Sequence, residues 1–146
     1  MLKIVTGDIF ESDTQTIVNT INCVGAMGKG IALEYKKRYP EMYIKYKELC
    51  NRNLIDIGKL WLHKTNEKWI LNFPTKKHWR DSSKTEYLEM GLQKFLDEYE
   101  NKGITSISFP LLGANNGGLN HKVSQEIMCK YLENCKINVL IFNNQK

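Results

Sequence analysis

The chain has 146 residues, of which 42% are hydrophobic and 25% are charged, and its formal net charge at pH 7 is +5. These proportions are typical of a globular domain and exclude a disordered or membrane-spanning chain. No two of Cys23, Cys50, Cys129 and Cys135 form a CxxC pair, which argues against structural zinc and a disulfide framework. The basic balance permits an anionic partner such as a nucleotide or nucleic acid.

The N-terminal sequence, MLKIVTGDIF, has no charged region followed by a long apolar stretch. We therefore expect no secretory signal, a cytoplasmic location and no membrane partner. The length predicts a single domain over residues 1–146, because no linker, repeat or low-complexity tract interrupts the chain.

An alternating apolar run predicts a first strand over Leu2–Thr6. Asp8 follows the end of this strand, at the edge where open α/β sheets bind ligands. Its carboxylate could accept hydrogen bonds from an amino group or from ribose hydroxyls, or it could cap a tight turn. The sequence leaves both interpretations open.

A second strand is predicted over Thr16–Thr20, and it runs into a segment that we call the first glycine loop, Asn19–Ile31, with the sequence NTINCVGAMGKGI. Glycines allow the backbone to approach a ligand closely, and the amides at the start of the following helix attract anions. The pattern predicts a phosphate site. A simple turn in the chain would also explain it.

Two helices are predicted next, over Ile31–Arg38 and Glu41–Cys50, with Pro40 ending the first of them. The runs Ile57–Lys64 and Lys68–Phe73 then alternate with period two, which predicts a β-hairpin.

The stretch Pro74–Arg80, PTKKHWR, is predicted to be an irregular loop. It concentrates positive and ionisable side chains, and neighbouring charges or partial burial lower the pKa of a lysine. An amine of this kind at Lys76, beside Lys77, His78 and Arg80, would serve as a nucleophile or a base. A solvated basic loop is the alternative.

The second half of the chain repeats the pattern of strand, glycines and helix. A helix is predicted over Thr85–Asn101 and a strand over Ile104–Phe109. The second glycine loop, Ser106–Asn120, reads SISFPLLGANNGGLN, and a helix over Asn120–Leu132 and a strand over Ile137–Phe142 follow it. Two such loops suggest a ligand with two phosphates, or with a phosphate and a sugar.

The alternation of strands and helices predicts the α/β class, as a three-layer α/β/α sandwich. The hairpin makes its central sheet mixed rather than wholly parallel. Both glycine loops and Asp8 would then share one edge of the sheet.

At this point the chain resembles the macrodomain family, which binds ADP-ribose. The resemblance rests on GDI at Gly7–Ile9 and on the stretches Ile17–Ala32, Asn72–Trp79 and Phe109–Asn120. The strings MGKGIA and NFPTK followed by HWR are most similar to the DarG-type branch of DNA ADP-ribosyl glycohydrolases, to which the terminal ADP-ribose protein glycohydrolase is related.

The resemblance implies an enzyme that removes ADP-ribose from a modified DNA base, with ADP-ribose as the ligand and with no cofactor or metal. Lys76 and Asn22 would be the catalytic residues, with Asn22 bound to the distal ribose, and Asp8 would receive the adenine amino group. The implied substrate-binding residues are Asp8, Ile9, Thr20, Gly28, Lys29, Gly30, Ile31, Thr75, His78, Gly113, Ala114, Asn115, Asn116, Gly117, Gly118 and Leu119.

The second glycine loop departs from the pattern of this branch. It reads GANNGGLNH where the branch usually has GCGNGGLDW, so the altered positions are Ala114, Asn115, Asn120 and His121. Asparagine tolerates left-handed backbone, and we therefore expect the loop to keep its shape. The acidic second catalytic group of the terminal ADP-ribose hydrolase aligns near Gly117 and is absent here.

Two other functions stay open at this stage within the family, namely a module that binds ADP-ribose or a nucleotide signal without cleaving it, and a hydrolase of protein-linked ADP-ribose. Generic nucleic-acid binding through basic helices is a third alternative. The expected partners are ADP-ribosylated substrates, single-stranded DNA and a toxin protein, and the chain is expected to act as a monomer.

Overall fold

A six-stranded sheet forms the centre of the computed structural model, which describes residues 1–144; positions 145–146 of the predicted domain lie outside the described residues. The strand order is β1-β6-β5-β2-β4-β3. The strands are β1 Leu2–Val5, β2 Thr16–Asn22, β3 Trp61–Lys64, β4 Trp69–Lys76, β5 Ser106–Pro110 and β6 Asn138–Phe142. All neighbours pair in parallel except β3 and β4, which confirms the mixed sheet.

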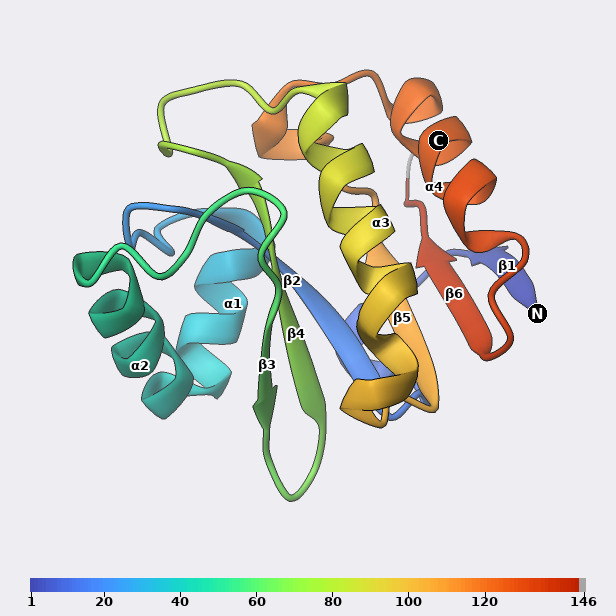
Figure 1. Cartoon of the computed structure of the whole chain (residues 1–146), viewed down its shortest axis with the longest axis horizontal. Coiled ribbons are helices and arrows are strands. Elements are labelled where there is room, and N and C mark those ends of the chain that lie inside the picture. The colour runs from blue at the N-terminus through green and yellow to red at the C-terminus, as the bar shows by residue number, and fades with distance from the viewer. Residues whose placement is uncertain (145–146) are drawn as a thin grey trace.

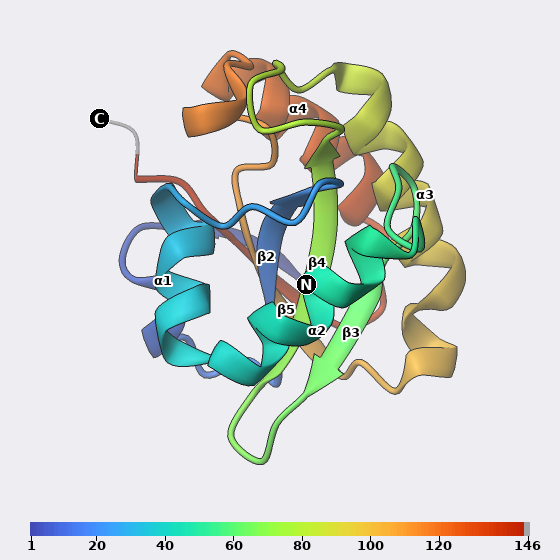
Figure 2. The same cartoon turned by 90° about the vertical axis from the view of Figure 1, so that its left-hand side faces the viewer.

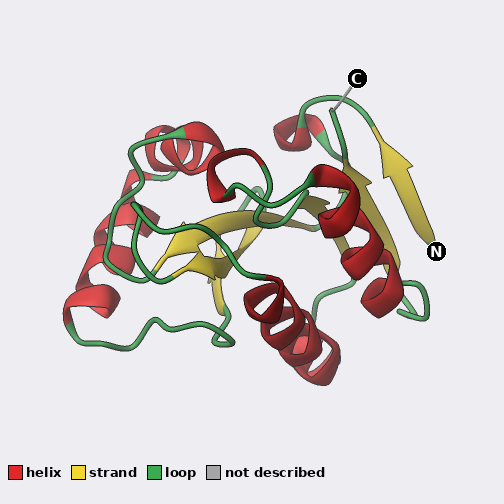
Figure 3. Cartoon of the chain, turned by 90° about the horizontal axis from the view of Figure 1, so that it is seen from above, coloured by secondary structure: helices red, strands yellow, loops and turns green. Residues whose placement is uncertain are grey.

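The helices lie in two layers, one on each face of the sheet. Helices α1 and α2 cover one face and α3 and α4 cover the other (Figures 1 and 3), so the predicted three-layer sandwich is confirmed. Their bounds are α1 Gly30–Arg38, α2 Pro40–Asn51, α3 Thr85–Lys102 and α4 His121–Leu132, and short 3-10 turns occupy Ile9–Glu11 and Asn115–Gly117.

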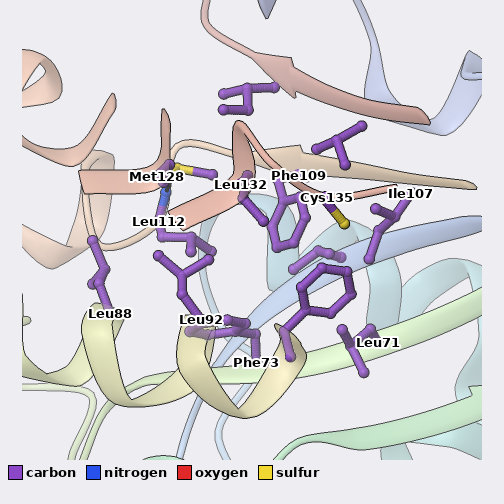
Figure 4. Close-up of a cluster of buried hydrophobic side chains, with 14 of the residues drawn as sticks. Leu71, Phe73, Leu88, Leu92, Ile107, Phe109, Leu112, Met128, Leu132 and Cys135 are labelled. Atoms are coloured by element: carbon purple, nitrogen blue, oxygen red, sulfur yellow. Dashed lines mark hydrogen bonds between the residues drawn. The ribbon is translucent and has the colours of Figure 1, made fainter. Parts of the chain in front are cut away.

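Each face of the sheet buries its own apolar cluster. Successive residues of a strand point to opposite faces, so Ile17 of β2 packs under α1 and α2 while Val18 packs under α3 and α4. Figure 4 shows the second cluster, in which Leu92 of α3 meets Phe73 of β4. Both faces of the central strand β2 are buried, so its apolar residues Ile17 and Val18 are adjacent in sequence rather than alternating.

The hairpin strands differ in length from the prediction. The first strand is shorter than Ile57–Lys64, because a turn in which Lys59 N donates to Asp56 O precedes it. The second continues through Lys76, so the prediction of an irregular loop from Pro74 onward was wrong. Strand β3 pairs with β4 only as far as Asn72, and one side of β4 then has no neighbour, so a proline without an N–H is tolerated there.

Two buried tyrosines fasten the helices α1 and α2 to the strand that enters the first glycine loop. The hydroxyl of Tyr35 on α1 donates to Val18 O over 2.9 Å, and the hydroxyl of Tyr46 on α2 donates to Asn22 O over 2.7 Å. Both side chains are fully buried, and a hydrogen bond of this kind contributes about 1 kcal/mol. These contacts hold the end of β2 in place.

Among the described residues, no helix is long and apolar enough to cross a membrane.

We predict that Gly91→Ala destabilises the protein although alanine favours helices. A Cβ at Gly91 would lie 2.3 Å from Cζ of Phe73, a buried ring with little room to move. Overpacking costs about 1 to 3 kcal/mol, and an approach this short favours the upper end of that range, above the roughly 1 kcal/mol that alanine gains in propensity. The urea concentration at the midpoint of unfolding should fall.

Gln93→Ala, on the exposed face of α3, is the control and should change stability by no more than about 0.5 kcal/mol. An unchanged midpoint for Gly91→Ala would contradict this packing.

Candidate functional site

A cleft of about 910 Å³ lies at the edge of the sheet where the parallel strands end. The segments that follow β1, β2, β4, β5 and β6 all contribute to its lining. Figure 2 shows the segment after β4 at the same end of the sheet as the segment between β5 and α4. Parallel strands place their carboxyl ends together, and ligands of open α/β sheets bind at that edge.

Most of the predicted site residues line this cleft. They are Asp8, Ile9, Thr20, Asn22, Gly28, Lys29, Gly30, Ile31, Thr75, Lys76, Gly113, Ala114, Asn115, Asn116 and Gly117. His78, Gly118 and Leu119 are not among the lining residues.

These three residues have local structural contacts instead. Nδ1 of His78 accepts a hydrogen bond from Arg80 N over 3.1 Å. Gly118 has a φ of 78° and ends the 3-10 turn. The backbone N–H of Leu119 donates to Gly113 O over 2.9 Å and closes the base of the second glycine loop.

Sequence reasoning missed part of the lining. The additional residues are Gly7, Ile21, Ala26, Ala32, Trp79, Pro110, Leu111, His121, Phe142, Asn143 and Asn144. The sequence could have indicated Asn144, because it follows the last predicted strand and so lies at the same edge of the sheet. Its side chain accepts a hydrogen bond from Gly7 N and donates one to Gly7 O.

The side chain of Asn22 organises the first glycine loop. Its Oδ1 accepts hydrogen bonds from Val24 N over 3.1 Å and from Ala26 N over 3.3 Å. The single hydroxyl proton of Tyr46 is shared between this Oδ1, at 2.9 Å, and Asn22 O, at 2.7 Å. Nδ2 of Asn22 donates to Ala26 O over 2.8 Å. The acceptor is fully used, and one amide proton is left for a ligand. Asn22 can therefore orient a ligand as a donor but cannot act as a base.

The N-terminus of α1 opens into the cleft. Lys29 occupies the N-cap position without a side-chain cap, and the first turn contains no acidic residue, so the backbone amides there can bind an anion. Gly30 has a φ of 59°, and a Cβ there would lie 2.5 Å from Nδ2 of Asn116, where the two glycine loops meet. No protein atom lies within 4 Å of a Cβ built at Gly28, which leaves that position open to a ligand.

The second glycine loop keeps its shape despite the altered residues. Asn115 has a φ of 22°, and its Oδ1 lies 3.1 Å from Nε2 of His121, so two of the altered positions contact each other. Gly117 packs on Ser83, whose N–H donates to Gly117 O over 2.8 Å. Asn120 caps α4 by accepting from two backbone amides. Asn115 thus has the positive φ that asparagine tolerates better than most residues.

Lys76 is the last residue of β4 and lies beside the first glycine loop. A β-bulge shifts the register of β2 and β4 so that Lys76 lies opposite Asn22. Its Nζ donates to Trp79 O over 3.3 Å. Bulges often redirect side chains next to active sites, and this one sets an amine in the cleft.

The pKa of Lys76 is lowered from the usual lysine value, as predicted, and partial burial was one of the two predicted causes, but the charges of Lys77, His78 and Arg80 are not among the causes. Partial burial is the main cause, and the positive charge of Lys29 is the second, while Asp81 acts in the opposite direction. The neighbours Lys77 and Arg80 extend into solvent, where water screens their charges. The second cause therefore comes from a residue of the first glycine loop, which is distant from Lys76 in sequence.

Asp8 caps a turn and also lines the cleft. Its Oδ1 accepts a hydrogen bond from Phe10 N over 2.9 Å and caps the 3-10 turn, so the turn-capping interpretation is confirmed. The residue also lines the cleft, and a carboxylate can accept more than one hydrogen bond. The cap therefore leaves acceptor capacity for a ligand.

Within residues 1–144, no group of three or more His, Cys, Asp or Glu side chains is placed to hold a metal ion.

Residues 18–128 match the model of the Macro domain family. The DNA ADP-ribosyl glycohydrolase of Mycobacterium tuberculosis is 41% identical over 147 residues, which cover 97% of this chain and 42% of that protein. A DNA ADP-ribosyl transferase-DNA ADP-ribosyl glycohydrolase fusion protein of Thermosipho africanus is 33% identical over 160 residues, which cover 97% of this chain and 41% of that protein. The chain thus spans less than half the length of these curated relatives.

Solved structures show the same similarity. The macrodomain of Mycobacterium tuberculosis DarG superposes with a TM-score of 0.95 at 39% identity, covering 99% of both chains. The structure of Thermosipho africanus DarTG in complex with ADP-ribose superposes with a TM-score of 0.92 at 35% identity, covering 97% of this chain and 41% of that one. These matches confirm the predicted resemblance and its fold.

We predict that Lys29→Gln raises the pKa of Lys76, because a nearby positive charge that disfavours the ammonium form is removed. Reaction of the neutral Lys76 amine with an amine-specific reagent, followed by peptide mapping across pH, measures this pKa directly. The midpoint of modification should move to higher pH.

Lys77→Gln is the matched control, since this exposed lysine is adjacent in sequence and is not among the causes of the shift. It should leave the midpoint unchanged. A shift for Lys77→Gln with none for Lys29→Gln would restore the interpretation based on sequence neighbours.

Proposed function

The chain belongs to the Macro domain family, and from this membership and the geometry of the cleft we propose that it is an ADP-ribosyl glycohydrolase that removes ADP-ribose from a DNA base. The observation that carries the proposal is the amine of Lys76. Its pKa is lowered, and it shares one cleft with two glycine loops suited to a diphosphate.

Each part of ADP-ribose has a complementary part of the cleft. The amides at the start of α1 and the loop Gly113–Gly117 would bind the diphosphate, since both offer backbone close to the ligand. Asp8 would accept the adenine amino group. Asn22 would donate its remaining amide proton to the distal ribose, which puts that sugar beside Lys76.

The neutral amine of Lys76 would carry out the cleavage in one of two ways. As a nucleophile it forms a bond to the anomeric carbon of the distal ribose, and the bond to the base breaks with its electron pair leaving on the base, which takes up the proton that the amine loses. Water then hydrolyses the lysine adduct, which frees ADP-ribose and restores the amine. As a base it takes a proton from a water that attacks the same carbon. Both require the neutral form, so turnover should rise with pH and level off above the lowered pKa of Lys76.

Two features of the relatives support a nucleic-acid substrate and an opposing enzyme. The relatives reported above are named for activity on DNA, and the Thermosipho africanus protein joins that activity to a DNA ADP-ribosyl transferase. We propose that this chain likewise reverses the action of a toxin that modifies DNA. A DNA substrate in a bacterium would place the activity in the cytoplasm.

The test uses a single-stranded oligonucleotide that carries ADP-ribose on one base. We predict that the wild type releases free ADP-ribose and that Lys76→Ala loses release by a factor of at least about 100, the lower end for a positioned proton-transfer group. Titration with free ADP-ribose should show binding by both proteins within about threefold, because the two glycine loops are intact in the variant.

Lys94→Ala is the control and should release ADP-ribose at the wild-type rate, since this side chain is exposed on α3 and does not line the cleft. Release by Lys76→Ala at the wild-type rate would refute the role of the lysine. Tight binding without release by the wild type, on DNA and on protein-linked ADP-ribose, would instead identify a non-catalytic ADP-ribose-binding module.

A further inference from the structure

Trp79 is a large aromatic side chain on the rim of the cleft that remains substantially exposed. It lines the cleft, and 47% of its surface is accessible to solvent. Exposing an indole forgoes much of the stabilisation that its burial would supply. The residue is also close to the reactive group, because its carbonyl accepts the hydrogen bond from Lys76 Nζ. An exposed aromatic in this position is suited to contact the substrate beyond the ADP-ribose.

The segment that carries Trp79 is fixed in position. We call it the rim segment, residues 77–84. A turn closes it where Asp81 N donates to His78 O over 3.0 Å, and Ser83 N donates to Gly117 O over 2.8 Å. Ser83 is buried, and a Cβ at Gly113 would lie 3.0 Å from its Cβ, so the segment packs on the second glycine loop. These contacts tie the backbone on both sides of Trp79 to a turn and to the second glycine loop.

The rim segment is also positively charged. It holds Lys77, Arg80 and Lys84 against a single acid, Asp81, and all four are exposed. The Arg80 guanidinium lies 4.7 Å from the centre of the Trp79 ring. An exposed aromatic ring with cations next to it is the combination that single-stranded nucleic acids contact, since bases stack on the ring and phosphates pair with the cations. An acidic protein surface would pair with the cations but would give no role to an exposed indole.

We propose that Trp79 is a stacking site for a nucleobase that flanks the modified base, and that Arg80 and Lys77 contact the backbone phosphates of the same single strand. The inference rests on the proposed function and adds to it that the enzyme contacts the nucleic-acid strand itself, in addition to the ADP-ribose group. The strand passes Trp79 on leaving the cleft, one short turn of chain from the Lys76 amine.

The experiment compares two substrates that carry the same ADP-ribosylated base, namely a single nucleoside and a single-stranded oligonucleotide. For Trp79→Ala, the loss of kcat/KM should be at least about tenfold greater on the oligonucleotide than on the nucleoside, and it should appear mainly in KM, because base stacking is lost. Trp79→Phe should recover most of the difference, since a smaller ring still stacks. Met90→Ala, which removes an exposed apolar side chain of α3 outside the cleft, should show no difference between the substrates.

A salt series gives a second measurement. The decrease in affinity of Lys76→Ala for the oligonucleotide with rising salt should become less steep when Arg80→Gln is added, because fewer counterions are then released on binding. An unchanged slope would remove the phosphate contact from the proposal.

The outcomes separate this inference from the proposed function. If the wild type releases ADP-ribose from both substrates and Trp79→Ala lowers kcat/KM by the same factor on both, Trp79 has only a structural role in the rim segment and the inference is wrong. If the wild type releases ADP-ribose from neither substrate, the proposed function is wrong and the inference falls with it.

Discussion

The pairing of β2 with β4 is the contact on which the arrangement of the site depends. Its register runs without interruption to Ile21 and then shifts, so that Asn22 lies opposite Lys76. Beyond the shift, Cys23 N still donates to Lys77 O over 3.2 Å, so the two strands remain joined as they leave the sheet. One irregularity in the sheet thus sets the amine beside the residue that shapes the first glycine loop.

Two cationic residues reach the cleft from different elements of the fold, and their positive charges suit a site for an anion. Lys29 lies at the start of α1 and Lys76 at the end of β4, and together with burial the charge of Lys29 lowers the pKa of Lys76. A bound diphosphate would bury the amine further, which lowers its pKa, but its negative charge would offset that of Lys29 and favour the ammonium form of Lys76. The pKa of Lys76 in the occupied cleft is therefore set by the balance of these opposing effects.

The layers and the glycine loops could be predicted from the sequence because they follow from local patterns, namely apolar periodicity and glycine before a helix. The prediction failed at Pro74, where a loop was expected and β4 continues. The proline is tolerated because β3 has already ended, so no strand on that side of β4 needs its missing N–H. The site required knowledge of contacts between distant residues. Tyr46 forms a hydrogen bond with Asn22 from 24 positions away, and the charge of Lys29, at the start of α1, lowers the pKa of Lys76, at the end of β4.

The central claim is that the cleft presents the anomeric carbon of the distal ribose to Lys76, and a crystal structure of the wild-type chain with ADP-ribose tests it most directly. The account predicts a diphosphate between Gly28–Ile31 and Gly113–Gly117, with the anomeric carbon within about 3.5 Å of Lys76 Nζ, the separation of reacting atoms in a productive complex. A distal ribose that points away from the lysine, or a diphosphate bound elsewhere, would contradict it.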